Sequence, residues 1–472
     1  MTQLSLHPDR LFSSNPTERD IARRLYNEVS AAPIYSPHGH VEASMLLDNV
    51  PFPDPAALLI TPDHYVTRLL HANGVELHEL GLARNGVPSP ASGRDIWRRF
   101  SENWNVFLGT PVMEWFEMEL SHVFGVTDVP SAANADSIYD QLAAAIETDA
   151  MRPRALFDSF GIRVLATTDD PADDLAAHAA LAADPTFTGH VLPTLRADVY
   201  MNPLAVGWKS KLDALSEASG IDCGTYHGLL TALRARREYF IAHGATATDT
   251  GVLDAGSDPL TPHDAERLHS AGLAGTLTAD EATAYRRNML YRFAEMSVDD
   301  GLVMQLHAGV IRNHHQPTFD AYGPDTGHDL PDRVSFTRPL EPILRDFGTD
   351  KTFHLVLFTV DESAFSREIA PLAGFYPAVY AGAPWWFLDS PAAMLRFRES
   401  VTETAGFAKT SGFIDDTRAF CSIPARHDMS RRVDASYLAS LVAKHQLTED
   451  SARDIAISLV STRPITTFRL PE

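Results

Sequence analysis

The sequence is poor in cysteine and has no long hydrophobic run. Its 472 residues include only two cysteines, Cys223 and Cys421, so a disulfide framework is excluded and a reducing compartment is expected. No stretch approaches the roughly 18 consecutive apolar residues of a membrane-spanning helix. The first 20 residues contain no apolar core of a secretory signal. We therefore expect a cytoplasmic protein that does not bind a membrane.

Positive charge is also scarce, because 39 Lys and Arg residues stand against 62 Asp and Glu, a formal net charge of −23. Contacts with phosphate groups require Lys and Arg, so general nucleic-acid binding is excluded. A small acidic substrate is not excluded, since salt screens distant surface charge over about 8 Å. Phosphate loops, nucleophile elbows, zinc knuckles and dinucleotide fingerprints are absent too, so no nucleotide cofactor is expected.

The sequence does contain eight short apolar runs, each of which ends on polar or charged residues. Continuous apolar runs are typical of strands buried on both faces of a parallel sheet. The runs lie at 34–40, 163–170, 190–196, 244–249, 303–307, 353–361, 377–384 and 407–416. Helical segments separate them, with N-terminal caps at Thr261 and Thr278. This α/β pattern predicts a (β/α)8 TIM barrel, and a doubly wound sheet is the alternative.

More than 100 residues separate the first two runs, far more than one crossover connection requires. Two groups of aromatic and aliphatic residues recur there at helical spacing. They are Trp97, Phe100, Trp104 and Phe107, then Val112, Trp115, Phe116 and Leu120. We interpret residues 74–149 as a helical insertion subdomain after the first strand, with these residues in its core. Residues 1–73 then hold an N-terminal helix and the first barrel strand, and residues 150–472 form the remainder of the barrel.

Catalytic groups of a (β/α)8 barrel lie at the carboxyl ends of its strands, and these run ends are polar. His38 and His40 are two residues apart, so on a strand both point the same way and can share a divalent cation. A third ligand must come from another strand, and Asp416 ends the eighth run, next to the first in a closed barrel. We predict one divalent metal ion there, with zinc as our choice, although nitrogen and oxygen ligands suit Mn, Fe or Co equally.

Arg196 ends an apolar run, where an arginine requires a partner. Its planar guanidinium can bind two oxygens of a substrate carboxylate, or it can form an ion pair with an aspartate at a neighbouring strand end. The same two interpretations apply to Arg312 in HAGVIRNHH. Cys421 has no evident activating partner and is interpreted as structural.

Six segments together resemble the uronate isomerases, a branch of the amidohydrolase superfamily. They read SPHGH, PDHYVTRLL, VLPTLRAD, QLHAGVIRN, PWWFLDS and DDTRAFCSIPARHD, and the resemblance runs from residue 34 to residue 433. H-x-H alone is common across the superfamily. The pair Asp416 and Arg418, followed by S-x-P-A-R-H-D, is more particular to this family, as are the paired tryptophans. The resemblance implies a distorted TIM barrel that interconverts D-glucuronate with D-fructuronate and D-galacturonate with D-tagaturonate.

The resemblance also implies roles for individual residues. Its metal ligands fall on His38, His40 and Asp416, its catalytic groups on Asp416, Arg418, Tyr65 and His64, and its substrate contacts on Arg196, Asp249, His307 and Trp386. An aldose–ketose isomerisation moves a proton between C2 and C1 through an enediol, so it requires a base and an electrophile near the carbonyl. Asp416 or Tyr65 is the candidate base, Arg418 the group beside the developing charge, and Arg196 the clamp for the C6 carboxylate.

This chain departs from the family pattern at two places. Members often carry Asp-His-Gly after the fourth strand, where this chain reads Asp249-Thr250-Gly251, so any role of that imidazole is absent. Many members also have an acid in the first-strand motif at the position of Ser36.

Two other functions stay open at this point. One is a one-metal hydrolase of the same superfamily that acts on a small acidic substrate, since no lysine closes the third or fourth run to bridge two metals. The other is a non-catalytic sugar-acid sensor, which would need only Arg196 and the tryptophans. The sequence is also compatible with a homo-oligomer.

Overall fold

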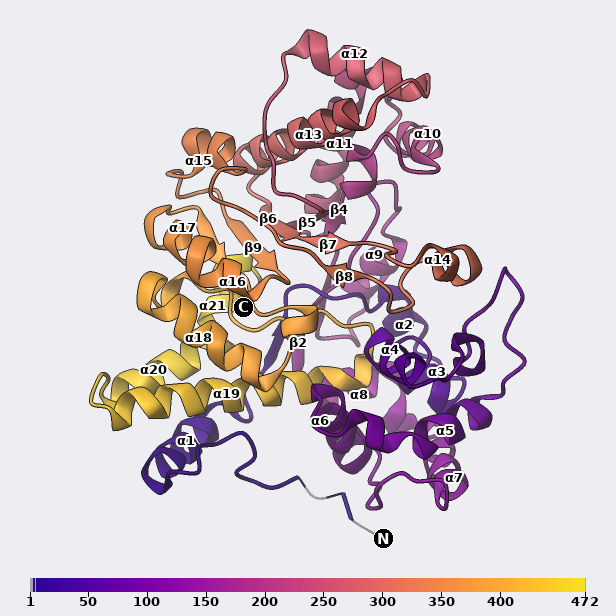
Figure 1. The fold of residues 1–472 in the computed structure, drawn as a ribbon, viewed down its shortest axis with the longest axis vertical. Helices are drawn as coiled ribbons and strands as arrows, with labels where there is room; N and C mark the ends of the chain where they lie inside the picture. The colour runs from indigo at the N-terminus through magenta and orange to yellow at the C-terminus, as the bar shows by residue number, and fades with distance from the viewer. Residues whose placement is uncertain (1–2, 5, 472) are drawn as a thin grey trace.

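Two parallel sheets form the centre of the protein, which we describe from a computed structural model covering residues 3–4 and 6–471 (Figure 1). The first sheet has the order β1-β2-β3 and the second the order β10-β9-β6-β5-β4. Their strands are β1 (Ile34–Ser36), β2 (Ile162–Ala166), β3 (His190–Leu192), β4 (Leu195–Arg196), β5 (Ala247–Val252), β6 (Val303–Ala308), β9 (Leu355–Thr359) and β10 (Val379–Ala381). Every pair within these two sheets is parallel.

Short contacts join the two sheets into a ring. β3 and β4 are one strand interrupted at Pro193, which has no N–H for the ladder. An isolated parallel bridge from Asp169 to Leu195 connects β2 to β4. At the other end, the backbone N–H of His40 donates to the carbonyl of Thr417 at 3.0 Å and returns the chain to β1. The segments therefore follow in chain order around an α/β ring of parallel strands, an arrangement consistent with the predicted distorted (β/α)8 barrel.

The last predicted strand is wrong in its detail. Phe407–Lys409 is a 3-10 turn, and of the following residues only Thr410 forms a bridge, with Ala381 of β10. Gly412 has a φ of +78°, a left-handed conformation that ends the extended pairing. The other seven apolar runs each contain a strand, most of them shorter than predicted.

Side chains alternate between the inside of the barrel and its helical cover, as β6 illustrates. All six residues of β6 are buried, so hydrophobicity alone does not reveal the alternation. Met304 and Leu306 pack in the cluster formed with the outer helices, whereas Val303 packs with the opposite cluster inside. Because successive side chains point to opposite faces, Gln305 and His307 point inward with Val303.

Helices cover the outside of the five-stranded sheet. The predicted cap at Thr278 is confirmed, since its side chain accepts from the N–H of Glu281 and the Glu281 side chain returns to the Thr278 N–H. Thr261 caps the preceding helix in the same way, accepting from the N–H of Asp264. The helices of this half are α10 (Trp208–Ser219), α11 (Tyr226–Ala242), α12 (Pro262–Leu273), α13 (Ala279–Asp300), α15 (Glu341–Phe347), α16 (Glu362–Ala364), α17 (Ala370–Phe375) and α18 (Pro391–Ala405). α9 (Ala176–Ala183) packs instead against β3 of the first sheet.

The long segment between β1 and β2 is helical, and its predicted aromatic core is confirmed. Trp97, Phe100 and Trp115 are at most 1% exposed and share one cluster with Ile34 and Val164 of the barrel. The segment thus packs directly on the first sheet. Its helices are α2 (Ala43–Asp48), α3 (Pro55–Leu59), α4 (His64–Ala72), α5 (Gly93–Glu102), α6 (Pro111–Met118), α7 (Ala135–Ile146) and α8 (Pro153–Ser159).

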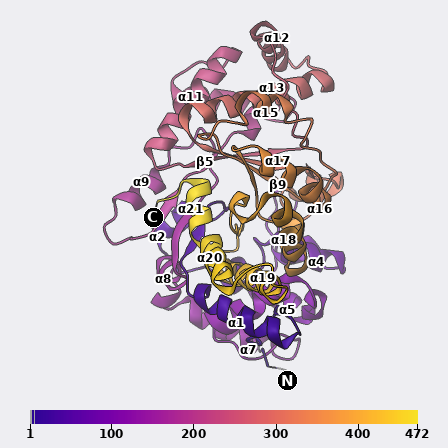
Figure 2. The same ribbon diagram turned by 90° about the vertical axis from the view of Figure 1, so that its left-hand side faces the viewer.

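Terminal helices pack together at one end of the molecule. α1 (Pro16–Val29) lies beside α19 (Ile423–Ala443) and α20 (Glu449–Val460), and α21 (Thr462–Phe468) follows (Figure 2). An antiparallel ribbon of β7 (Val310–Ile311) and β8 (Leu330–Pro331), with α14 (Gln316–Tyr322) between its strands, was not predicted. Across the described part of the chain, no helix has the length and apolar character needed to cross a membrane.

Candidate active site

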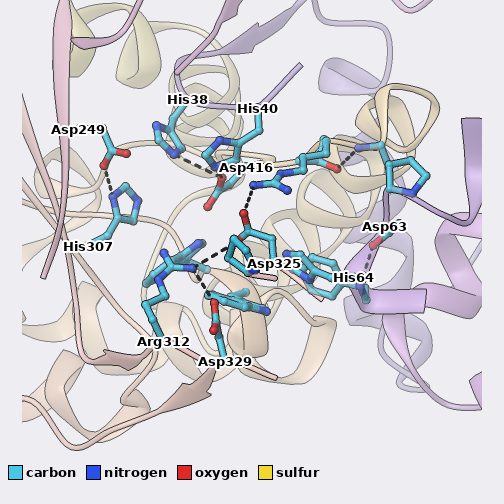
Figure 3. A pocket seen from close by; sticks show the side chains of 18 of the residues that line it. His38, His40, Asp63, His64, Asp249, His307, Arg312, Asp325, Asp329 and Asp416 are labelled. Atoms are coloured by element: carbon cyan, nitrogen blue, oxygen red, sulfur yellow. Dashed lines mark hydrogen bonds and ion pairs between the residues drawn. The ribbon is translucent and has the colours of Figure 1, made fainter. Parts of the chain in front are cut away.

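A cavity of about 290 Å³ lies at the carboxyl ends of the strands (Figure 3). The structure brings together around it all ten residues for which the sequence predicts a site role. They are His38, His40, His64, Tyr65, Arg196, Asp249, His307, Trp386, Asp416 and Arg418. Their individual roles stay predictions, and the geometry below states what each side chain can do.

His38, His40 and Asp416 meet where the ends of the ring close. One carboxylate oxygen of Asp416, Oδ1, lies 3.0 Å from Nε2 of His40 and 3.4 Å from Nε2 of His38. This buried oxygen makes no well-aligned hydrogen bond with the residues that the structure describes. Asp416 also has a φ of +38°, a strained backbone conformation of the kind that clusters at functional sites. A buried carboxylate oxygen beside two imidazole nitrogens fits a divalent cation.

His307, which the sequence placed with the substrate contacts, forms a donor set with His38 and Asp416 that does not include His40. Donor atoms of His38, His307 and Asp416 all lie within 4.8 Å of one another. Nδ1 of His307 is bonded to Oδ1 of Asp249 at 2.7 Å, while the buried Nε2 has no hydrogen-bond partner among the described residues. Burial lowers the pKa of His307 by more than Asp249 raises it, so the imidazole is neutral. A neutral imidazole oriented by a carboxylate is the usual form of a metal ligand.

Arg196 pairs with two aspartates at the strand ends. Its Nε lies 3.1 Å from Oδ1 of Asp198 and its NH2 lies 3.2 Å from Oδ2 of the same carboxylate. NH1 lies 3.3 Å from Oδ2 of Asp249, which is only 1% exposed. Burial works against ionisation of Asp249, but Arg196 and His307 hold its pKa well below the usual value. The ion pairs considered from the sequence are therefore present, and a substrate carboxylate would share this guanidinium with them.

His64 and Tyr65 form one wall of the cavity with Trp386. Asp63 caps α4 by accepting from the N–H of Tyr65 at 2.8 Å, which places His64 at the first helical position. The ring of His64 lies 5.1 Å from that of Trp386, centroid to centroid. Burial lowers the pKa of His64 to about 3 and raises the pKa of Tyr65 above its ordinary value. At neutral pH the imidazole is therefore uncharged and the phenol keeps its proton.

The ribbon connection between β7 and β8 supplies cavity residues that sequence reasoning missed. Asp325 accepts from NH2 of Arg418 at 2.9 Å, and Asp329 accepts from NH1 of Arg312 at 2.9 Å. The guanidinium of Arg312 lies 5.3 Å from the ring centroid of Trp386. The two aspartates follow none of the eight apolar runs, so the strand-end rule did not point to them. Of the two interpretations of Arg312, the ion pair is present in the structure, with Asp329 as its partner.

Helices outside, parallel strands inside and a polar cavity at the carboxyl ends of the strands define an α/β-barrel protein with a candidate site in the usual place for this class. The chain matches the family model described as glucuronate isomerase over residues 12–460. It is 52% identical over 470 residues to uronate isomerase from Corynebacterium efficiens, which covers 99% of this chain and 100% of that protein. The chain belongs to the glucuronate isomerase family.

Solved structures agree with this assignment. The crystal structure of glucuronate isomerase from Caulobacter crescentus matches with a TM-score of 0.98 at 43% identity, covering 100% of this chain and 98% of that chain. Uronate isomerase from Thermotoga maritima matches with a TM-score of 0.92 at 29% identity, covering 98% of this chain and 99% of that chain. The similarity therefore includes the helical segment between β1 and β2 as well as the barrel.

Proposed function

We propose that this protein is a hexuronate isomerase that interconverts D-glucuronate with D-fructuronate and D-galacturonate with D-tagaturonate. The observation that carries the proposal is one cavity that gathers a His–Asp donor set, an ionised carboxylate and arginines, in a chain that matches its family over residues 12–460. This combination suits proton transfer on a small acidic sugar and requires no redox cofactor.

Asp416 is the proposed base. Although burial opposes ionisation, the neighbouring imidazoles of His38 and His40 hold the pKa of Asp416 well below its usual value, so the carboxylate is charged. It would take the proton from C2 of the aldose while the C1 oxygen gains a proton, which leaves an enediol between C1 and C2. Return of a proton to C1, with loss of the O2 proton, then gives the 2-ketose. Arg418 would stabilise the negative charge that develops on these oxygens.

Tyr65 is a hydrogen-bond donor in this proposal, not the base. Its raised pKa means that the phenol stays protonated over the working range of pH, so it can donate to a sugar oxygen but cannot accept the C2 proton. His64 is neutral and can accept or donate through either ring nitrogen. The two side chains, on the first turn of α4, would orient the sugar between the base and the tryptophan wall.

A divalent cation, for which we propose zinc, would be held by His38, His40 and Asp416, with His307 as a further ligand. When bound, it would anchor substrate oxygens and polarise the carbonyl group. Arg196 would bind the C6 carboxylate through N–H groups not engaged by Asp198 and Asp249. We also propose a cytoplasmic location, which both buried free cysteines support. A homo-oligomeric state stays a prediction.

One assay tests the function. Purified protein is incubated with each uronate, with and without a chelator, and ketouronate formation is followed together with Asp416→Asn as the matched control. We expect turnover of at least one uronate and, with metal content restored to the parent level, a loss of about 10²–10⁴-fold in Asp416→Asn, the usual contribution of a general base. Uronate binding without turnover would favour the sensor, and cleavage of amides or esters without ketouronate formation would favour the hydrolase. The match to the glucuronate isomerase family over nearly the whole chain favours neither the sensor nor the hydrolase.

A further inference from the structure

The S-x-P-A-R-H-D element, which the proposed mechanism does not use, begins helix α19 behind the cavity. Ser422 precedes the helix, and Arg426, His427 and Asp428 occupy its first turns. Neither Arg426 nor His427 is among the described residues that line the cavity. Both are nevertheless buried, with exposures of 0% and 6%. Asp428 faces the other way and pairs with Arg432 and Arg10. Two buried, polar side chains thus point from α19 toward the site.

Arg426 connects two walls of the cavity. Its NH1 donates to Oδ2 of Asp389 at 2.5 Å, and its Nε donates to Oγ of Ser422 at 3.0 Å. The guanidinium lies 4.8 Å from the ring centroid of Tyr65. Asp389 ends the short turn that begins at Trp386, because its N–H donates to the Trp386 carbonyl at 3.0 Å. One guanidinium therefore touches the Tyr65 wall and holds the turn that carries the tryptophan.

Arg426 also packs on Trp115, 3.6 Å from that ring, so its own position is fixed by the helical segment between β1 and β2. Trp386 has a φ of +53°, a conformation that a bulky residue keeps only when the surrounding structure enforces it. The buried pair with Asp389 supplies such a restraint three residues away. Loss of this pair would allow the tryptophan turn to relax.

His427 restrains the opposite wall. Its Nε2 lies 2.9 Å from Oδ2 of Asp415, which is 1% exposed. Asp415 is the residue before Asp416, whose own φ is positive. Since the ladder has already ended at Gly412, few backbone bonds hold this segment, and the His427–Asp415 contact anchors it from behind. Consecutive residues on a helix point about 100° apart, which is how neighbours can reach different walls.

We propose that Arg426 and His427 are positioning residues: they hold the turn of Trp386 and the segment of Asp416 in the arrangement that isomerisation requires. The role of that arrangement rests on the proposed function, whereas the restraint itself does not. We call Arg426 and His427 the α19 brace. Catalysis is sensitive to such restraint, since a displacement of about 1 Å at reacting groups can reduce the rate by about 10²-fold.

The chain offers a matched control on the same helix. Arg398 of α18 and Asp434 of α19 form another buried pair, with Nε 2.6 Å from Oδ1 and NH2 2.8 Å from Oδ2. Neither residue lines the cavity among the described residues. The double variants R426M/D389N and R398M/D434N each remove both charges of one pair, so neither leaves an uncompensated buried charge.

Kinetics on the metal-loaded enzymes provide the first test. We expect kcat/KM for the preferred uronate to fall by about 10²-fold in R426M/D389N, chiefly through kcat. In R398M/D434N, kcat/KM should stay near that of the parent, although its thermal midpoint should be similar to that of R426M/D389N. His427→Leu should lose turnover, and His427→Gln, whose amide can still donate to Asp415, should recover most of it. Parent-like kinetics in R426M/D389N and His427→Leu, or an equal loss in R398M/D434N, would overturn the proposal.

Hydrogen exchange provides a test that needs no substrate. Peptides covering residues 384–389 should exchange faster in R426M/D389N, and peptides covering 413–418 faster in His427→Leu, with neither change in R398M/D434N. Unchanged exchange in these peptides would refute the restraint even if activity fell. If the parent fails to convert uronates but the exchange changes occur, the proposed function is wrong and the brace stands as a structural device. Variants that do not fold are replaced by Arg426→Lys, which keeps the charge but not the planar fork and should give the same exchange change at 384–389.

Discussion

Replacement of Asp249 by asparagine tests how the inner end of the cavity is organised. Asp249 on β5 contacts two proposed functional groups, Nδ1 of His307 at 2.7 Å and NH1 of Arg196 at 3.3 Å. Asparagine keeps the size of the side chain but removes its charge. Its amide can donate to Nδ1, in which case the imidazole proton moves to Nε2 and the lone pair that faces the cavity is lost.

The magnitude follows from what Arg196 keeps. Breaking a buried ion pair costs about 3–5 kcal/mol when the remaining charge has no partner. Here Asp198 still accepts from Arg196 at 3.1 and 3.2 Å, so the cost should be that of one charged hydrogen bond, about 1.5–3 kcal/mol. Loss of the carboxylate that orients a ligand histidine typically reduces metal affinity or activity by about 10–100-fold. We expect both effects in Asp249→Asn.

Urea unfolding, metal content and ketouronate formation measure these effects on one preparation. Asp198→Asn is the matched control, because it removes the other partner of Arg196 without contacting His307. It should raise KM and leave metal content near that of the parent. If Asp249→Asn keeps parent kcat and metal content, or if Asp198→Asn reproduces its losses, the orientation of His307 by Asp249 is not required.

Three further predictions concern the metal, the substrate and acid stability. His307→Ala and His40→Ala should both lower the zinc content, and elemental analysis of His307→Ala showing parent zinc levels would exclude His307 as a ligand. Arg196→Met should reduce kcat/KM for glucuronate by about 2–5 kcal/mol of transition-state free energy, and efficient conversion of glucose by the parent would contradict the clamp. Burial raises the pKa of Glu368, but hydrogen bonds from the backbone N–H groups of Thr337 and Phe336 outweigh this effect and lower the pKa to about 2. The ionised Glu368 carboxylate therefore stabilises the folded protein fully above the ordinary pKa of a glutamate, and this stabilisation is lost as the pH falls toward 2. Glu368→Gln should destabilise the protein by about 1–2 kcal/mol at pH 7 after allowance for solvent screening, and unfolding curves that differ from the parent equally at pH 7 and pH 2 would disprove this.

The sequence by itself determined the class of fold, because a short, continuously apolar segment forms a strand buried on both faces through the properties of its own residues. Seven of the eight apolar runs contain strands for this reason, and the cap at Thr278 formed because it needs only residues within one turn. His38 and His40 both reach Asp416, but they follow β1, which ends at Ser36, so the strand alternation expected from the H-x-H spacing does not apply to them. Motif resemblance, and not spacing, supplied the substrate class.

Only the tertiary structure decided which distant groups meet. His307 lies with His38 and Asp416 because three strand ends approach one another across the barrel. All six residues of β6 are buried, so no periodic pattern in the sequence marks His307 as inward-facing. Pairing of Arg196 with Asp249 depends on the register between β4 and β5, whereas Asp198 lies only two residues along the chain from Arg196. The irregular segment at 407–416 arises from the left-handed Gly412, which local hydrophobicity did not indicate. Contacts from α19 to Asp389 and Asp415 exist because the helix packs behind the barrel, a placement set by long-range burial that no local pattern encodes.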